Sequence, residues 1–305
     1  MRRVMIALAG AIALLAPSAQ ATVAGPNGLI AFRANTGSGD QIYTIDPQTL
    51  TQVQLTHVDG DALQPHWSPD SSLITFEFDP ANDCAHVAYM DADGGNMVVL
   101  PHANHNQCEG TPSFSPDGKL IFYEGFNGVR RDGIWSTSLD GSNRRLITNC
   151  EGGATGPEVS PDGRMLAFAC FSRKGQALFD SRVDGSHLRQ LTPWSFNVGT
   201  RQDWSPDSDR IMFISTHDQG TPAAQVNTAT IRPDGTGLFW VTSYPAGGPL
   251  AFGNSYSPDG QWIVLRLEEN GLYALYKIRT NGTDLTPITS FSDFRPRGMA
   301  WGSAS

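Results

Sequence analysis

The sequence has few positive charges and, after its N-terminal segment, no long apolar run. Its 21 Lys and Arg residues stand against 30 Asp and Glu residues, a formal net charge of −9. Nucleic acids and anionic membrane surfaces are bound by cationic faces, so this charge argues against both as partners. A membrane-spanning helix needs about 20 consecutive apolar residues. No later stretch supplies them, and stable membrane insertion is not expected.

The common catalytic and nucleotide-binding motifs are also absent from the sequence. It contains no G-x-S-x-G nucleophile elbow, no H-E-x-x-H zinc motif, no Walker loop and no dinucleotide fingerprint. Helical periodicity of the apolar residues is missing as well. The sequence therefore predicts no catalytic residues, no cofactor and no metal, and a non-enzymatic role is the favoured interpretation.

Residues 1–21 have the pattern of a secretory signal peptide. Arg2 and Arg3 provide a positive start, residues 4–15 form an apolar run, and Ala19-Gln20-Ala21 is a small-residue cleavage pattern. Cleavage after it would leave 19 basic and 30 acidic residues, a formal charge of −11. We therefore expect a periplasmic or secreted protein.

A short motif recurs along the rest of the chain, in which a large or branched apolar residue precedes Ser-Pro-Asp. The five copies begin 47, 45, 45 and 52 residues apart. Pro presets φ for a tight turn and Ser can bond back to the backbone, so each copy predicts a turn between two strands. A period of this length is typical of propeller blades. The copies begin at Ser68, Ser115, Ser160, Ser205 and Ser257, after Trp67, Phe114, Val159, Trp204 and Tyr256, and Trp301 continues the series.

The strands around each motif indicate four per unit, because Asp-Gly or Asn-Gly hairpin turns follow farther along. The first unit begins with a segment, 29–32, that matches a second strand, whereas 297–302 matches an innermost strand. We therefore predict an all-β fold, a six-bladed β-propeller of four-stranded blades that the C-terminal strand closes by completing the first blade. Residues 22–305 would form this single domain. Ser71 and Ser208 replace the usual turn glycine, and those turns should be slightly strained or differently shaped.

The repeated aromatic–Ser-Pro-Asp-Gly–apolar strand pattern resembles the propeller of TolB-like proteins. The resemblance covers nearly the whole mature chain and implies the six-bladed fold. TolB proper carries an α/β domain ahead of its propeller, and so few residues precede the first strand here that we expect the propeller part only. The resemblance implies a protein- or peptide-binding scaffold of the cell envelope, or alternatively a metal-assisted, polysaccharide-lyase-like enzyme that uses the same face. The sequence makes no prediction of oligomeric state.

The four cysteines allow three pairings. Consecutive pairing, Cys84–Cys108 and Cys150–Cys170, fits the blade map, because links between blades and loops between second and third strands emerge on the same side of a propeller. A metal site is the alternative, but C-x-x-C spacing is missing and an exported protein favours disulfides. Each bridge would stabilise the fold by about 3 kcal/mol.

The longest connections, 101–110, 193–202 and 243–253, should surround the channel mouth on one face. A scaffold that gathers its variable loops on one face usually binds there. Aromatic residues of one link could stack on sugar, anchor a peptide or fold back, and the charged candidates could contact a partner or pair with one another. The partner-binding candidates are Gln64, His66, His105, Glu158, Trp194, Phe196, Arg201, Asp203 and Arg297.

Four of the seven histidines, His66, His86, His102 and His105, gather in or beside one blade. They are compatible with a metal site or an acid–base group at the ring mouth. They are also compatible with surface-loop histidines near a disulfide, which is the favoured interpretation. Resemblance to the TolB-like oligogalacturonate lyases, which bind a metal through His and Gln, makes Gln64 and His66 candidate ligands.

Overall fold

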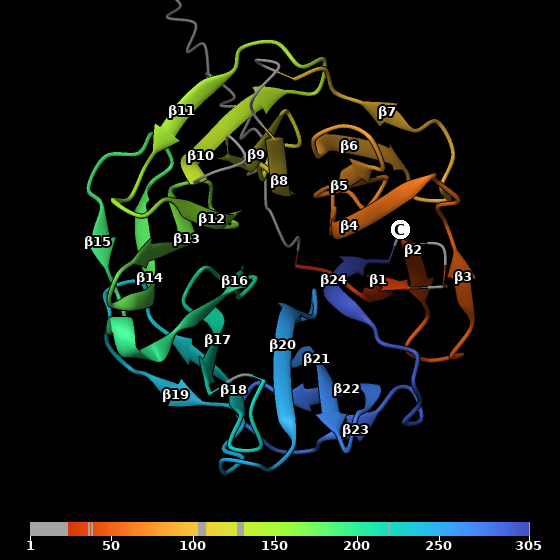
Figure 1. Cartoon of the computed structure of the whole chain (residues 1–305), viewed down its shortest axis with the longest axis vertical. Helices are drawn as coiled ribbons and strands as arrows, with labels where there is room; N and C mark the ends of the chain where they lie inside the picture. Colours follow the sequence, from red (N-terminus) through yellow and green to blue (C-terminus); the bar gives the residue numbers. More distant parts are fainter. Residues whose placement is uncertain are drawn as a thin grey trace, which may run out of the picture.

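The computed structural model describes residues 24–35, 37, 39–102, 108–126, 131–218 and 220–304. The predicted signal peptide lies outside the described residues. Six four-stranded antiparallel sheets surround a central axis as blades (Figure 1). The predicted all-β, six-bladed propeller is therefore confirmed.

Each blade runs from an innermost strand beside the axis to an outermost strand at the rim (Figure 1). From the inside outward, blade 1 contains β24 (Arg297–Ser303), β1 (Asn27–Asn35), β2 (Asp40–Ile45) and β3 (Gln52–Gln54); blade 2 contains β4 (Gly60–Trp67), β5 (Leu73–Pro80), β6 (His86–Asp91) and β7 (Val98–Val99); blade 3 contains β8 (Cys108–Phe114), β9 (Leu120–Phe126), β10 (Arg131–Ser138) and β11 (Arg145–Thr148). Blade 4 contains β12 (Ala154–Val159), β13 (Met165–Ser172), β14 (Gly175–Arg182) and β15 (Arg189–Gln190); blade 5 contains β16 (Val198–Trp204), β17 (Ile211–His217), β18 (Gln225–Ile231) and β19 (Phe239–Trp240); blade 6 contains β20 (Leu250–Tyr256), β21 (Trp262–Glu269), β22 (Leu272–Arg279) and β23 (Thr286–Pro287).

The Ser-Pro-Asp motifs form the turns between the first and second strands. In the first copy the hydroxyl of Ser68 donates to the Asp70 carboxylate at 2.7 Å and accepts the amide of Leu73 at 2.9 Å, which closes the turn. Ser71 and Ser208 have φ of +55° and +61°, so these two serines carry the left-handed conformation that glycine adopts in the other copies. We call the side of the ring that carries these turns the turn face, and the side that carries the links between blades the loop face.

The apolar residues ahead of these turns pack between neighbouring blades. Trp204 is 1% exposed, and its indole donates to the carbonyl oxygen of Glu158 in the preceding blade at 2.9 Å. Trp67 donates in the same way to the carbonyl of Ala300 at 3.1 Å. Burying one such side chain stabilises the fold by roughly 1.5–3 kcal/mol, so the repeat encodes the contacts that hold the ring together.

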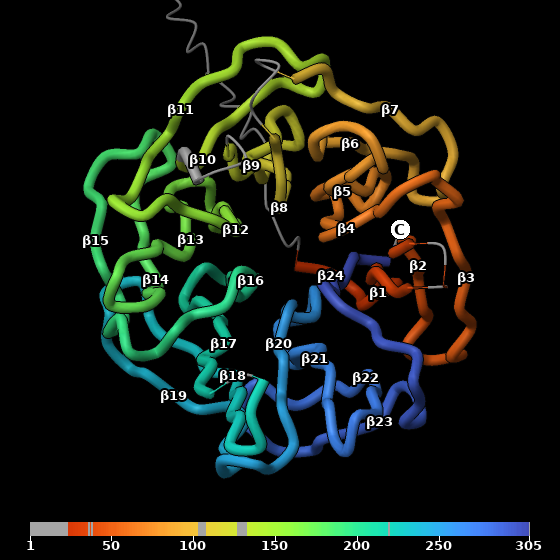
Figure 2. The backbone as a smooth tube through the Cα atoms, in the orientation of Figure 1, coloured from red at the N-terminus to blue at the C-terminus, as the bar shows by residue number. Residues whose placement is uncertain are grey.

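The two ends of the described chain share one sheet, as predicted. β24 pairs with β1 in antiparallel register, with Trp301 opposite Ile30 (Figure 2). The Trp301 indole donates to the carbonyl of Gly28 at 3.1 Å, and the amide of Ala304 donates to Pro26 at 2.8 Å. Pairing the last strand with the first removes two exposed sheet edges that would otherwise end the ring.

Both predicted disulfides are present, and Cα–Cα distances of 5.1 Å for Cys84–Cys108 and 5.7 Å for Cys150–Cys170 suit them. Cys84 lies in the expected loop after β5. Cys170 lies inside β13, opposite Ala154, rather than in the loop beyond that strand, because β13 extends farther toward the loop face than the sequence indicates. The described residues contain no helix with the length and apolar character needed to cross a membrane.

Candidate functional site

The innermost strands turn one edge toward the channel, where their amide groups have no neighbouring strand to pair with. Side chains of the preceding blade take over this role. The Nδ1 atom of His66 accepts the amide of Phe114 at 3.3 Å, and the Asp203 carboxylate accepts the amide of Tyr256 at 2.6 Å. A buried amide without an acceptor would cost about 1–3 kcal/mol, so these polar residues first serve the ring itself.

Two polar contacts cross the channel. Because His66 Nδ1 accepts a hydrogen bond and so carries no hydrogen, the ring hydrogen lies on Nε2, which donates to the Glu158 carboxylate, two blades away, at 2.8 Å. Arg201 reaches from blade 5 to blade 2 on the opposite side of the ring, where its guanidinium donates to the carbonyl of Pro65 at 2.6 Å. The same group donates to the carbonyl of Gly298 at 3.1 Å. Arg201 therefore closes the channel with a side chain.

Arg201 separates two cavities of different size and character. On the turn face, His66, Glu158 and Asp203 line a cavity of about 30 Å³, with room for on the order of two water molecules. On the loop face, a cavity of about 340 Å³ opens among the starts of the innermost strands. We call it the mouth cavity; its lining includes Arg33, Gln64, Arg201, Phe252, Arg266 and Arg297.

Two acids deep in the ring have strongly shifted pKa values. Burial, followed by repulsion from Glu158, raises the pKa of Asp203 to about 7. Burial likewise raises the pKa of Glu77 to about 7, and the nearby carboxylate of Glu124 adds to the rise, although Glu77 accepts the amide of Thr111 at 3.0 Å. Burial lowers the pKa of Arg201. Both carboxyl groups therefore change protonation near neutral pH.

The mouth cavity is lined by four arginines and, among the described residues, by no carboxylate. Arg266 stacks on the ring of Phe252, 4.0 Å from its centroid, and lies 3.4 Å from the Glu268 carboxylate. Burial, with repulsion from Arg295, lowers the pKa of Arg266 to about 9. Burial is the larger cause of this fall, and the repulsion from Arg295 adds to it. Positive charge is therefore gathered here, although the chain as a whole is acidic.

Arg33 and Arg297 lie beside the same carboxylate, Asp40, which is not part of the cavity lining. Arg33 forms an ion pair with Asp40, and Arg297 lies 3.9 Å from the same carboxylate. Burial, then repulsion from Arg295 and Arg33, lowers the pKa of Arg297. With 36% of its side chain exposed, Arg297 is the member of the group most open to an incoming ligand.

Several polar atoms of the cavity wall are buried and have no hydrogen-bond partner in the part of the chain that the structure describes. They include Oε1 of Gln64 and the Nε atoms of Arg33, Arg201 and Arg266. Gln64 also has a φ of +53°, a conformation that costs a non-glycine residue energy. Unused hydrogen-bonding groups around a cavity are suited to a polar ligand, and guanidinium groups favour carboxylates, which they can bind with two parallel hydrogen bonds.

The structure brings together six of the nine predicted partner-binding residues. Gln64, Arg201 and Arg297 line the mouth cavity, whereas His66, Glu158 and Asp203 lie deeper, on the turn-face side of Arg201. Glu158 and Asp203 lie near the ends of their strands, one residue before β12 and β16 end. His105 lies outside the described residues.

The two aromatic candidates lie away from the channel. A short 3-10 helix, η1 (Trp194–Phe196), carries both. Trp194 packs against Phe179 with ring centroids 5.5 Å apart, and Phe196 packs against Phe213 and Trp240 at 6.3 and 5.7 Å. Both are half-buried, and neither lines the mouth cavity. They fold back onto blades 4 and 5, which is the alternative that the sequence left open.

Sequence reasoning missed the charged residues of the second strands. The residue three positions after the one that pairs with the turn-heading apolar residue lines the mouth cavity in three blades, as Arg33, Ile214 and Arg266. The signal in the sequence was a single charged residue at the same position of otherwise apolar second strands, and it could have indicated these residues. The equivalent positions are Arg33, Glu77, Glu124, Ala169, Ile214 and Arg266.

Comparisons with known proteins agree with the propeller fold. The family model described as the TolB beta propeller domain matches residues 78–236, which is about half of the chain. An uncharacterized protein of Agrobacterium fabrum is 36% identical over 153 residues, covering 48% of this chain and 49% of that protein. The Tol-Pal system protein TolB of Francisella tularensis subsp. tularensis is 27% identical over 199 residues, covering 64% of this chain and 41% of that protein.

Among solved structures, TolB from Acinetobacter baumannii superimposes with a TM-score of 0.74 at 19% identity, covering 91% of this chain and 67% of that one. At this identity the likeness establishes the fold alone. The chain spans less than half the length of the curated relatives described above.

Proposed function

The chain belongs to the TolB beta propeller domain family, and from this membership we propose that it is an exported binding module. Its mouth cavity would hold an acidic segment of a protein or peptide of the cell envelope. Relatives carry the name of the Tol-Pal system, and the two disulfides suit an oxidising compartment outside the cytoplasm. The disulfides support export, and the name of the relatives supports an envelope partner.

The observation that carries the proposal is the charge of the cavity lining. Four arginines face a cavity of about 340 Å³, and their carboxylate partners, Asp40 and Glu268, lie outside that lining. A glutamate or aspartate side chain that enters can accept from Arg297 while its backbone meets the unpaired Oε1 of Gln64. A hydrogen bond between charged groups contributes about 1.5–3 kcal/mol, which corresponds to roughly a tenfold or greater gain in affinity.

An acidic polysaccharide is the second candidate, because its uronate carboxylates suit the same arginines. The lyase-like alternative would use Gln64 and His66 as metal ligands. Both ring nitrogens of His66 are already engaged, Nδ1 by the Phe114 amide and Nε2 by Glu158. Metal binding there would have to break the contact that joins blades 2 and 4. The geometry therefore favours binding over metal-assisted elimination.

The test compares two versions of one peptide. A fluorescein-labelled glutamate-rich peptide and its counterpart with glutamine at every glutamate are titrated with the protein, and anisotropy reports binding. We expect the acidic peptide alone to bind, with an affinity that falls as salt is added. Arg297→Gln should weaken binding about tenfold or more.

The matched control is Arg164→Gln, whose side chain is 83% exposed on the turn face. It removes the same charge from the protein without touching the mouth cavity, so it should leave the affinity unchanged. Equal losses of affinity in the two variants would show that only the net charge of the protein matters, and would refute the proposed site. Release of unsaturated product from polygalacturonate with Mn²⁺ would establish the lyase alternative instead.

A further inference from the structure

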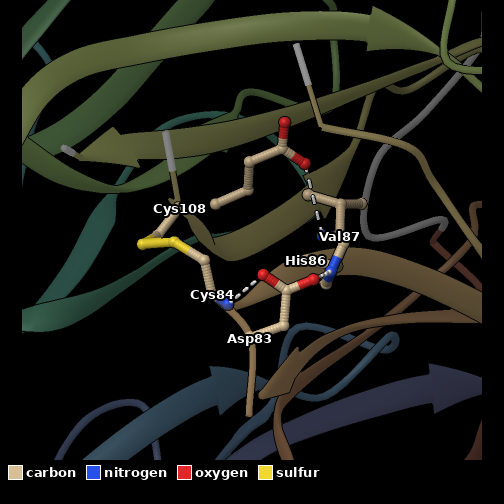
Figure 3. Close-up of a disulfide and its surroundings, with 6 residues drawn as sticks. Asp83, Cys84, His86, Val87 and Cys108 are labelled. Atoms are coloured by element: carbon tan, nitrogen blue, oxygen red, sulfur yellow. Dashed lines mark hydrogen bonds and ion pairs between the residues drawn. A yellow bond between two sulfur atoms is a disulfide. The ribbon is translucent and has the colours of Figure 1, made fainter. Parts of the chain in front are cut away.

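A second group of polar side chains lies apart from the channel lining, and two of its members, Asp83 and His86, lie beside the Cys84–Cys108 disulfide (Figure 3). Asp83 belongs to the loop between β5 and β6, His86 begins β6, and His102 follows β7. None of the three lines the mouth cavity. Their chemistry is therefore independent of the proposed peptide binding.

The three side chains converge on one point. One ligand-type atom from each, a carboxylate oxygen or a ring nitrogen, lies within 4.8 Å of the other two. His86 Nε2 is 3.4 Å from Asp83 Oδ2 (Figure 3). The imidazole rings of His86 and His102 are stacked, with their centroids 3.7 Å apart. Two imidazoles and a carboxylate at these separations can supply three corners of a tetrahedral site once the stacked rings rotate apart, so that a nitrogen of each points at the same ion.

Two of these side chains are oriented by backbone groups. His86 Nδ1 lies 3.2 Å from the carbonyl oxygen of Leu100, so it donates there and leaves Nε2 as the basic nitrogen. The amide of Cys84 donates to Asp83 Oδ1 at 2.8 Å, which leaves Oδ2 turned toward His86 (Figure 3). Outer contacts of this kind are the ones that hold metal-binding histidines and carboxylates in position.

His102 supplies the independent observation. Both of its ring nitrogens are shielded from solvent, and neither makes a well-aligned hydrogen bond among the described residues. Burial lowers the pKa of this imidazole, and a backbone group of Cys84 that lies near the ring acts to raise the pKa, with a smaller effect. A shielded imidazole normally satisfies at least one nitrogen, and the stacked ring of His86 gives it none. A cation bound by one ring nitrogen of His102, together with His86 and Asp83, would give that nitrogen a partner.

We propose that Asp83, His86 and His102 bind a divalent transition-metal ion of the Zn²⁺ class through two imidazole nitrogens and one carboxylate oxygen. Imidazole favours Zn²⁺ and its neighbours over Ca²⁺ and Mg²⁺, which require mainly oxygen ligands. Water would complete the coordination. The ion would tie the loop before β6 to the segment after β7, close to the disulfide that joins the same loop to β8.

The experiment uses untagged, disulfide-bonded protein that has been treated with EDTA and then titrated with ZnCl₂ by calorimetry. We expect one saturable site per chain. His102→Ala and Asp83→Asn should each weaken Zn²⁺ binding at least about tenfold, since even loss of an outer contact costs a metal site roughly 10–100-fold. Co²⁺ bound to the wild-type protein should show the visible absorption of a tetrahedral site with nitrogen and oxygen ligands.

The control variant is His57→Ala, which removes an exposed histidine outside the group and should bind Zn²⁺ like the wild type. Asp83 has a side chain that is 64% exposed, so Asp83→Asn leaves the core intact even if His102→Ala unfolds. Absence of saturable binding would overturn the proposal. So would Zn²⁺ binding that Asp83→Asn leaves unchanged.

Discussion

The pKa of Asp203 predicts a stability change that depends on pH. Its pKa rises from 3.8 to about 7 on folding because the carboxyl group is buried beside Glu158. The folded protein therefore holds this proton more tightly than the unfolded chain does. Stability is highest below the unfolded pKa and falls as pH rises from about 4 to about 7. A difference of about three pKa units corresponds to about 4 kcal/mol lost by pH 8.5.

Asp203→Asn removes this titration while keeping an oxygen that can accept the Tyr256 amide. Relative to the wild type, the variant should gain about 3 kcal/mol of unfolding free energy between pH 5 and pH 8.5, because part of the loss has already occurred at pH 5. Any constant effect of the amide group cancels in that comparison. Glu77 titrates in both proteins and cancels in the same way.

Urea unfolding of both proteins at several pH values between 5 and 8.5 measures this difference. The matched control is Asp209→Asn, an exposed position a few residues along the same blade, and it should show little pH-dependent change. A difference between Asp203→Asn and the wild type that stays constant over this range would refute the burial argument. A difference of the opposite sign would show that the folded state favours the charged carboxylate.

Two further changes test how the ring is held. Trp301→Ala should lower the free energy of unfolding by about 3–5 kcal/mol in urea titrations, since it empties a buried site at the seam between β24 and β1; a loss below 1 kcal/mol would show that the seam is not needed. Replacing Cys84 and Cys108 together by serine should cost about 3 kcal/mol, and reducing agent should then destabilise the wild type more than the variant, which retains only the Cys150–Cys170 bridge.

The sequence allowed the fold to be predicted because each blade repeats the same local chemistry. A Ser-Pro-Asp turn needs only neighbouring residues to form, and its spacing sets the length of a blade. The innermost strand at Trp301 and the second strand near Ile30 each lack a partner within their own segment, which indicated the closure. The cysteine pairing followed from the loops that the blades place on one side.

The candidate site could be predicted only in part, because its members meet across the ring. Arg201 contacts Pro65, 136 residues away, and nothing local in either segment indicates that contact. Arg33 and Arg266 needed the register of the second strands before their common position became visible. Trp194 had two plausible orientations, and packing against Phe179 selects one of them.

The guanidinium of Arg201 closes the central channel of the ring between the turn face and the loop face. A propeller with an open axis could let a polymer thread from one face to the other, whereas here the side chain is anchored to two carbonyl groups on the far wall. The mouth cavity is therefore closed at its inner end, and a ligand must enter and leave by the opening on the loop face. An extended chain cannot pass through it, so a peptide or glycan would have to present a free end, a side chain or the tip of a bend.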